Sequence, residues 1–194
     1  MSGEARRPAV FLDRDGTLTA EADWVTKSQE LAILPFAAEA ISVLARAGFA
    51  VVLATNQSAV ARGLISEGEL AEIHAHLERE LARGGARLDG IYWCPHHPTE
   101  GAAPYRRECE CRKPKPGMLL AAARDLGLDL GRSFVVGDAG RDLAAGSAVG
   151  ACGILVATGK GAAERERLER AGKEPERFVP DVLAAAREIA RQGR

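Results

Sequence analysis

The feature that most constrains the fold is an apolar run over residues 9–12 that ends in Asp13-Arg14-Asp15-Gly16. A run that is apolar at every position is typical of a strand buried on both faces of a parallel sheet. Asp13 and Asp15 stand at alternate positions, so an extended backbone would direct both carboxylates to the same side. Two carboxylates this close need a cation, a shared proton or a separating turn. A divalent ion with oxygen ligands, such as Mg²⁺, meets that need, and a solvated turn at the strand end is the alternative.

Strands and helices alternate along the rest of the chain. Apolar segments predict four further strands, over residues 49–54, 88–93, 133–136 and 153–157. Helices are predicted over residues 35–48, 66–83, 117–126, 140–149, 162–171 and 180–192, with a capping box at Ser66 and Glu69. This alternation is typical of a three-layer α/β fold with a central parallel sheet of about five strands. We expect one domain over residues 1–194, with no large insertion acting as a cap, and a monomer.

Polar side chains follow three of these strands: Asp13, Thr55 and Asp138. In such sheets, ligands bind outside the carboxyl ends of the strands at a topological switch point, so these side chains should meet in one crevice. An acidic crevice repels an anionic substrate, because two like unit charges about 4 Å apart cost about 4 kcal/mol near a protein surface. Lys113 alone cannot offset several such repulsions, whereas Mg²⁺ bridging a carboxylate and a phosphoryl oxygen can. The residues therefore predict phosphoryl transfer, with one aspartate as nucleophile and another as general acid and base.

The charge balance of the chain limits its partners. The 194 residues carry a formal net charge of −1, which argues against a sequence-independent grip on nucleic acid or on an anionic membrane. Residues 1–8 are polar and charged, and no apolar run approaches the length of a signal peptide or a membrane span. We therefore expect a cytoplasmic protein without a nucleic-acid or membrane partner.

Three of the four cysteines lie close together, at Cys94, Cys109 and Cys111. In a reducing compartment, such a cluster indicates metal binding rather than disulfides. Three thiolates and one imidazole, from His96 or His97, would form a closed tetrahedral zinc site of the structural type.

Such a site would also shape the loop over residues 94–116. This loop has little apolar content, so packing alone would hardly define its conformation. A bound zinc ion would fix the loop and direct Arg112 and Lys113 toward the crevice.

Four ordered motifs resemble those of the haloacid dehalogenase (HAD) superfamily of phosphatases. They are Asp13-Arg14-Asp15-Gly16-Thr17, Thr55, Lys113 and Gly137-Asp138-Ala139-Gly140-Arg141-Asp142. The resemblance implies that Asp13 attacks phosphorus and becomes a phosphoaspartate, and that Asp15 protonates the leaving oxygen and later activates water. It also implies that the Asp13 carboxylate, the Asp15 backbone carbonyl and Asp138 hold Mg²⁺. Thr55 and Lys113 would bind the phosphoryl oxygens.

The segments around the cysteines narrow the resemblance. Cys94-Pro95-His96-His97-Pro98 and Cys109-Glu110-Cys111-Arg112-Lys113-Pro114-Lys115-Pro116-Gly117-Met118 resemble the heptose bisphosphate phosphatase family. The resemblance implies a structural zinc ion bound by Cys94, His96, Cys109 and Cys111. It implies a phosphorylated sugar as substrate, with hydrolysis of the 7-phosphate of a heptose 1,7-bisphosphate. It also places a set of residues against the substrate, namely Arg14, Glu21, Ala22, Asp23, Trp24, Asn56, Gln57, Ser58 and Arg112.

Five positions depart from that family. Thr19 and Asp23-Trp24 stand where members often have Asn and Gly-Tyr, and Ala139 and Ala157 stand where many members have Lys and Arg. The lost positive charge weakens the expectation of a second substrate phosphate. The rival functions are a histidinol-phosphate phosphatase, a polynucleotide 3′-phosphatase and a zinc-stabilised binding module without catalysis.

Other polar residues have simpler interpretations. His74 and His76 lie two apart on a predicted helix, so they face different directions and are expected at the surface. Gly159-Lys160-Gly161 lacks the glycine spacing of a P-loop, so the sequence predicts no nucleotide site there.

Overall fold

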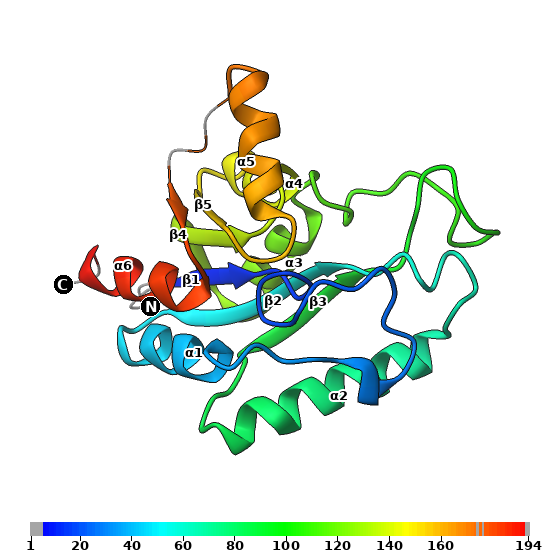
Figure 1. The fold of residues 1–194 in the computed structure, drawn as a ribbon, viewed down its shortest axis with the longest axis horizontal. Helices are drawn as coiled ribbons and strands as arrows, with labels where there is room; N and C mark the ends of the chain where they lie inside the picture. The colour runs from blue at the N-terminus through cyan, green and yellow to red at the C-terminus, as the bar shows by residue number, and fades with distance from the viewer. Residues whose placement is uncertain (1–5, 174, 176, 193–194) are drawn as a thin grey trace, which may run out of the picture.

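Six parallel strands form one sheet in the computed structural model, which describes residues 6–173, 175 and 177–192 (Figure 1). The strands are β1 (Arg7–Leu12), β2 (Ala50–Asn56), β3 (Gly90–Cys94), β4 (Leu128–Gly137), β5 (Cys152–Val156) and β6 (Phe178–Val179). Their order in the sheet is β3-β2-β1-β4-β5-β6. The predicted parallel sheet is confirmed, with one strand more than expected. The additional strand, β6, has only two residues, which are too few to show a periodic pattern.

Helices cover both faces of this sheet. They are α1 (Ala37–Arg46), α2 (Glu67–Arg83), α3 (Gly117–Leu126), α4 (Gly140–Ser147), α5 (Gly161–Arg170) and α6 (Val182–Gln192), with a 3-10 turn, η1, at Ser28–Glu30. Val10 and Leu12 of β1 pack into a core with α1, α2 and α6, whereas Ala9 and Phe11 pack against α3 on the opposite face. This alternation follows from the pleat of the strand, and it confirms the three-layer α/β fold. Within the described ranges, no helix is both long and apolar enough to cross a membrane.

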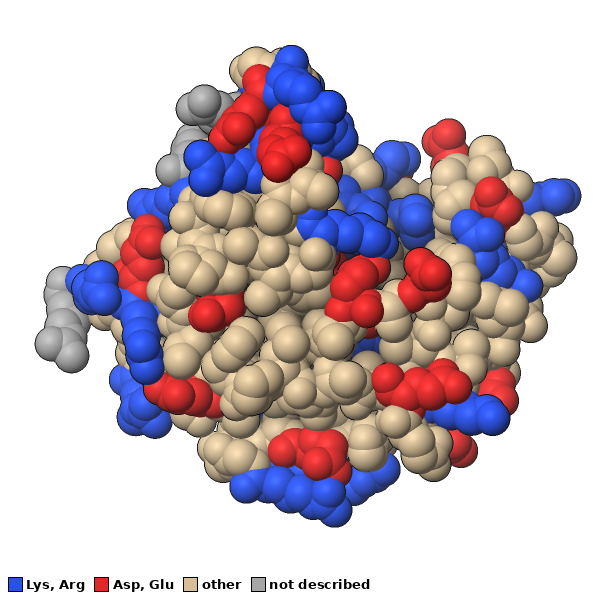
Figure 2. Space-filling view, viewed as in Figure 1, with Lys and Arg blue, Asp and Glu red and all other residues tan. Residues whose placement is uncertain are grey.

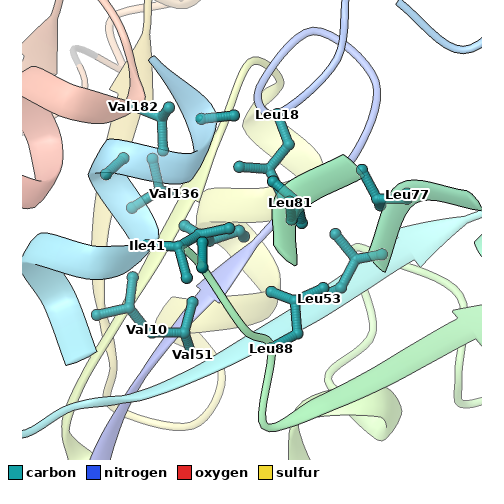
Figure 3. Close-up of a cluster of buried hydrophobic side chains, with 14 of the residues drawn as sticks. Val10, Leu18, Ile41, Val51, Leu53, Leu77, Leu81, Leu88, Val136 and Val182 are labelled. Atoms are coloured by element: carbon teal, nitrogen blue, oxygen red, sulfur yellow. The ribbon is translucent and has the colours of Figure 1, made fainter. Parts of the chain in front are cut away.

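The core between α1, α2 and the sheet extends to the turn that follows β1 (Figure 3). Leu18 comes from this turn and lies in one fully buried cluster with Ile41, Leu53 and Leu81. Burying a side chain of this size stabilises the fold by about 1.5–3 kcal/mol. The Leu18 N–H also donates to the Arg14 carbonyl at 2.9 Å. The turn is therefore anchored at both ends, by β1 in the sheet and by Leu18 in the core.

Helix α2 begins as its sequence predicts. The Glu69 N–H donates to Ser66 Oγ at 3.2 Å, and the Ser66 N–H donates to Glu69 Oε2 at 2.7 Å, so the capping box is confirmed. The surface position expected for His74 is wrong, because this side chain is only 5% exposed. His74 lies four residues after Leu70 and three before Leu77, and both leucines face the core. That spacing places the histidine on the buried face of the helix.

Burial of His74 should make the stability of the protein depend on pH. Burial, and secondarily the charge of Arg14, lowers the pKa of His74 to about 3, whereas an unfolded chain has a value of about 6.5. Between these two pKa values the histidine is protonated in the unfolded chain but not in the folded one. The contribution of neutral His74 to stability is therefore fully present above pH 6.5 and is lost as the pH falls. Between pH 6.5 and 4.5 we expect this group to lower the free energy of unfolding by about 2 kcal/mol.

Urea denaturation at pH 7 and pH 4.5 checks this prediction by comparing the native chain with His74→Gln and with the half-buried control His76→Gln. Only His74→Gln should reduce the pH dependence of the free energy of unfolding. An unchanged pH dependence in that variant would show that His74 has the same pKa in the folded and unfolded chains.

Candidate active site

The acidic residues of the first and fourth motifs meet at the carboxyl edge of the sheet. Asp13 directly follows β1, and Asp138 directly follows β4. These two strands are neighbours at the place where the chain, having built β2 and β3 on one side of β1, crosses to the other side. Such a topological switch point leaves a crevice between the strand ends. The strand-end rule therefore accounts for the meeting of Asp13 and Asp138.

Lys113 is buried between two carboxylates. Its Nζ lies 3.0 Å from Asp13 Oδ1 and 2.5 Å from Asp142 Oδ1, and it donates to the Ala54 carbonyl at 2.6 Å. Burial alone would raise the pKa of Asp13, but the charges of Lys113 and Arg141 and the hydrogen bonds from Lys113 and the Arg14 N–H together outweigh this effect and lower that pKa. Oδ1 also accepts the Arg14 backbone N–H at 2.8 Å. In the described part of the chain nothing donates to Asp13 Oδ2, which leaves this oxygen available to react.

Two tight turns close around the Asp138 carboxylate. Gly16 and Gly159 have φ angles of 77° and 60°, a region that favours glycine. A Cβ at either position would come within 2.1 or 2.3 Å of Asp138 Oδ2. The Lys160 N–H donates to the same oxygen at 2.8 Å, and Thr158 Oγ1 donates to the Gly16 carbonyl at 2.6 Å. The glycines of both turns are therefore required for the approach of Asp138 to Asp13.

Three carboxylates form a group that could hold a metal ion. Asp13, Asp138 and Asp142 each bring one oxygen within 4.8 Å of the others. Asp138 Oδ1 is buried and has no hydrogen-bond partner among the described residues. Burial, together with the charges of Asp13 and Asp142, raises the pKa of Asp138 to about 7. Oxygen ligands of this kind fit Mg²⁺.

The Asp15 carboxylate lies outside this group. Arg14 donates to it twice, from Nε to Oδ1 at 2.9 Å and from Nη2 to Oδ2 at 3.0 Å. Gln57 Nε2 donates to the same Oδ2 at 2.9 Å. β1 ends at Leu12, so Asp13 and Asp15 are not successive residues of one extended strand, although both line the same pocket. The backbone carbonyl of Asp15 stays the predicted ligand.

A pocket of about 140 Å³ opens over Asp13. Its lining residues are Asp13, Arg14, Asp15, Glu21, Ala22, Asp23, Trp24, Val25, Thr55, Asn56, Gln57, Ser58, Ala59, Arg112, Arg141 and Lys160. This lining includes every residue that the family resemblance places against substrate. Lys113 and Asp138 are buried beside it.

Two cations in this lining, Arg141 and Lys160, are not among the site residues that the sequence predicts. Lys160 Nζ lies 2.5 Å from Glu21 Oε1. Arg141 has neither a hydrogen bond nor an ion pair within the ranges that the structure describes. Figure 2 shows basic and acidic side chains side by side to the right of centre, on the side where the strands of Figure 1 end. Both cations follow strands closely, so the rule that located Asp13 and Asp138 could have located them too.

The three clustered cysteines meet one histidine. Their Sγ atoms lie 3.2–3.5 Å apart, and His96 Nδ1 lies 3.3 Å from Cys111 Sγ and 3.6 Å from Cys94 Sγ. Tetrahedral zinc with bonds of about 2.3 Å to sulfur would separate the sulfurs by about 3.8 Å, close to this arrangement. His97 Nδ1 instead accepts the Glu100 N–H at 2.9 Å. The geometry therefore favours His96 over His97 as the fourth zinc ligand.

The loop that carries this cluster is tied to the pocket. Asn56 at the end of β2 pairs with the backbone of Lys113, donating to its carbonyl at 3.0 Å and accepting its N–H at 3.1 Å. Arg112 Nη1 donates to the His96 carbonyl at 3.0 Å. The cysteine–histidine cluster thus supports the segment that places Arg112 and Lys113.

Known proteins are similar to this chain in sequence and in fold. A sequence model described as HAD-hydrolase-like matches residues 110–185. The D-glycero-beta-D-manno-heptose-1,7-bisphosphate 7-phosphatase of Vibrio cholerae serotype O1 is 41% identical over 179 residues, which span 91% of this chain and 96% of that protein. The protein of the same name from Escherichia coli K12 is 40% identical over 79% of this chain and 81% of its own length. The crystal structure of D,D-heptose 1,7-bisphosphate phosphatase from B. bronchiseptica, complexed with magnesium and phosphate, superposes with a TM-score of 0.83 at 38% identity, covering 95% of this chain and 99% of that one.

The fold and the site define a class of protein. A parallel sheet with Asp13, Lys113 and Asp138 gathered at its switch point is that of a HAD phosphatase. The match over nearly the whole length of the Vibrio cholerae relative narrows the class. The chain belongs to the D-glycero-beta-D-manno-heptose-1,7-bisphosphate 7-phosphatase family.

Proposed function

We propose that the protein hydrolyses the 7-phosphate of D-glycero-D-manno-heptose 1,7-bisphosphate through a phosphoaspartate on Asp13. The observation that carries this proposal is one pocket lined by Asp13, Asp15 and four basic residues; Arg14 is paired with Asp15, and the other three are Arg112, Arg141 and Lys160. A substrate with one phosphate at Asp13 and a second phosphate against the cations would match this distribution of charge. The names of the relatives support the same substrate.

In the first half-reaction, Asp13 Oδ2 attacks the phosphorus atom. The new oxygen–phosphorus bond forms as the bond from phosphorus to the sugar oxygen breaks, and Asp15 gives its proton to that oxygen. Lys113 keeps the nucleophile ionised through its ion pair with Asp13 Oδ1. The hydroxyl group of Thr55, which lines the pocket, would hold a phosphoryl oxygen.

The second half-reaction regenerates the enzyme. Asp15, now a carboxylate, takes a proton from water, and the water oxygen attacks the phosphorus of the phosphoaspartate. The bond between phosphorus and Asp13 breaks, and inorganic phosphate leaves. Asp13 is again a carboxylate, and Asp15 is again protonated.

The donor sets in the chain fit two metal ions. The proposed Mg²⁺ ligands are the Asp13 carboxylate, the Asp15 backbone carbonyl and Asp138, whose unpartnered oxygen supports the assignment. When bound, Mg²⁺ supplies positive charge to the phosphoryl oxygens and so favours attack at phosphorus. The proposed zinc ligands are Cys94, His96, Cys109 and Cys111. Four protein ligands leave no open position, so the role of this zinc is structural.

Arg141 and Lys160 bear on the second phosphate. Ala139 and Ala157 leave the pocket without the Lys and Arg of many family members. Arg141 lies two residues after Ala139, Lys160 lies three residues after Ala157, and both line the same pocket. Guanidinium and ammonium groups are the usual partners of phosphate. We therefore propose that these two residues supply the positive charge that the alanines lack.

A substrate panel in the presence of Mg²⁺ tests the proposed function. It comprises the heptose 1,7-bisphosphate, the heptose 7-phosphate, histidinol phosphate and a 3′-phosphorylated oligonucleotide. The bisphosphate should have the highest kcat/KM, about 10–100-fold above the 7-phosphate, because a hydrogen bond to a charged group contributes about 1.5–3 kcal/mol. The double variant Arg141→Ala, Lys160→Ala should narrow that preference. Faster hydrolysis of histidinol phosphate or of the oligonucleotide would contradict the proposed substrate.

The cellular location and the oligomeric state of the protein remain predictions. We propose a cytoplasmic location, which is supported by a thiolate cluster suited to a reducing compartment. We also propose a monomer, which sedimentation of the purified protein would check.

A further inference from the structure

Among the residues that the structure describes, Arg14 is the largest side chain that is completely buried. The residue borders the pocket, but only 2% of its side chain is exposed. Burying a guanidinium group is costly, and an apolar side chain of similar volume often stabilises a core better. The Nη1 atom has no hydrogen-bond partner among the described residues. Stability alone therefore does not account for an arginine at this position.

The guanidinium group is directed at one carboxylate. Its Nε and Nη2 atoms form two parallel bonds with Asp15, at 2.9 and 3.0 Å. Two parallel bonds of this kind fix the plane of a carboxylate, which a single bond would not do. From the side of β2, Gln57 Nε2 donates to Asp15 Oδ2 at 2.9 Å and to Thr55 Oγ1 at 3.0 Å. Asp15 is thus held from two elements of the fold.

A second ionisable group near Arg14 is His74 of helix α2. The charge of Arg14 contributes to the lowered pKa of His74, which lies on the buried face of that helix. The Nε2 atom of His74 also lacks a hydrogen-bond partner among the described residues. With His74 neutral, Asp15 is the only ionisable group to which the guanidinium group is bonded in the described ranges. The burial of Arg14 therefore serves its contact with Asp15.

We infer that Arg14 is a positioning residue, whose buried guanidinium group fixes the Asp15 carboxyl group for proton transfer. This inference rests on the proposed role of Asp15 as general acid and base. Proton transfer requires the carboxyl oxygen to lie within hydrogen-bond reach of the leaving oxygen and to point toward it. An Asp15 side chain without the two parallel bonds would sample other orientations. The fraction of molecules in which its carboxyl oxygen points toward the leaving oxygen would therefore fall.

The dependence of the rate on the leaving group tests this inference. We choose 4-nitrophenyl phosphate and 4-nitrobenzyl phosphate as probes. The nitrophenolate group is a weak base that leaves without a proton, whereas the benzyl alkoxide is a strong base that must receive a proton as it leaves. The value of kcat/KM covers the steps up to cleavage of the phosphorus–oxygen bond. Arg14→Met should lower it at least about 10-fold more for the benzyl ester than for the phenyl ester, within the range that general acid catalysis supplies. Arg14→Lys keeps the charge but not the two parallel bonds, and should fall between the native chain and Arg14→Met.

A double-mutant cycle separates this role from a general loss of structure. If Arg14 acts through Asp15, Arg14→Met should cost nothing further in an Asp15→Asn background. Arg124→Met is the matched control, because Arg124 pairs with the next residue, Asp125, at 3.1 Å on the surface of α3. This control variant should leave kcat/KM unchanged for both esters.

Equal losses for the two esters would overturn the inference, as would an added loss in the Asp15→Asn background. Should Arg14→Met fail to fold, Arg14→Lys carries the same comparison. Neither probe contains the sugar, so this test is independent of the heptose panel: a protein that rejects the heptose but shows the leaving-group effect retains the role of Arg14.

Discussion

Asp13→Asn should abolish turnover, with a fall in kcat of about 10⁴-fold or more, because a carboxamide cannot replace the carboxylate nucleophile. The substitution preserves the shape of the side chain, and Lys113 keeps its second partner, Asp142, at 2.5 Å. Most of the fold should therefore survive, although loss of the ion pair at 3.0 Å will lower the melting temperature. Release of inorganic phosphate and circular dichroism during heating measure the two effects.

Asp125→Asn is a suitable control, since Asp125 lies on the surface of α3. It should retain native activity. If Asp13→Asn still turned over at more than about one hundredth of the native rate, another group would have to attack phosphorus. Detection of the phosphoaspartate by mass spectrometry in the native chain, and its loss in the variant, would link the rate effect to the intermediate.

Cys109→Ser should release the zinc ion and loosen the loop over residues 94–116. Apparent binding energies of structural zinc sites are about 10–16 kcal/mol, and they stabilise the fold directly because the unfolded chain lacks the site. Cys109 supplies one of the four donors around the cluster. Elemental analysis should find about one zinc ion per native chain and almost none in the variant, and limited proteolysis should cut the loop.

The activity of Cys109→Ser should fall as well, because Arg112 and Lys113 belong to the same loop and Arg112 is held by the His96 carbonyl. Cys152→Ser is the matched control, since Cys152 lies in β5, away from the cluster. It should keep its zinc and its protease resistance. An unchanged zinc content in Cys109→Ser would remove this cysteine from the ligand set.

Much of the fold follows from local pattern. The apolar run before Asp13 predicts β1, and the capping box at Ser66 predicts the start of α2, because each signal depends only on neighbouring residues. The edge strand β6 is not predicted, since two residues carry no periodicity. The surface position predicted for His74 is wrong because the spacing to His76 says nothing about the core, whereas the spacing to the buried leucines of α2 does.

The sequence by itself determined which chemical groups reach the carboxyl edge of the sheet. Parallel strands place their ends together, so the strand pattern alone assigns Asp13 and Asp138 to one crevice. The tertiary structure alone decided which way the side chains point there. Beyond the end of β1 at Leu12, the Asp15 carboxylate bonds to Arg14 instead of joining the carboxylates of Asp13 and Asp138. The approach of β5 to β4 brings Lys160 to the same pocket as Arg141. Side-chain direction depends on turns and on contacts between distant segments, neither of which a strand pattern contains.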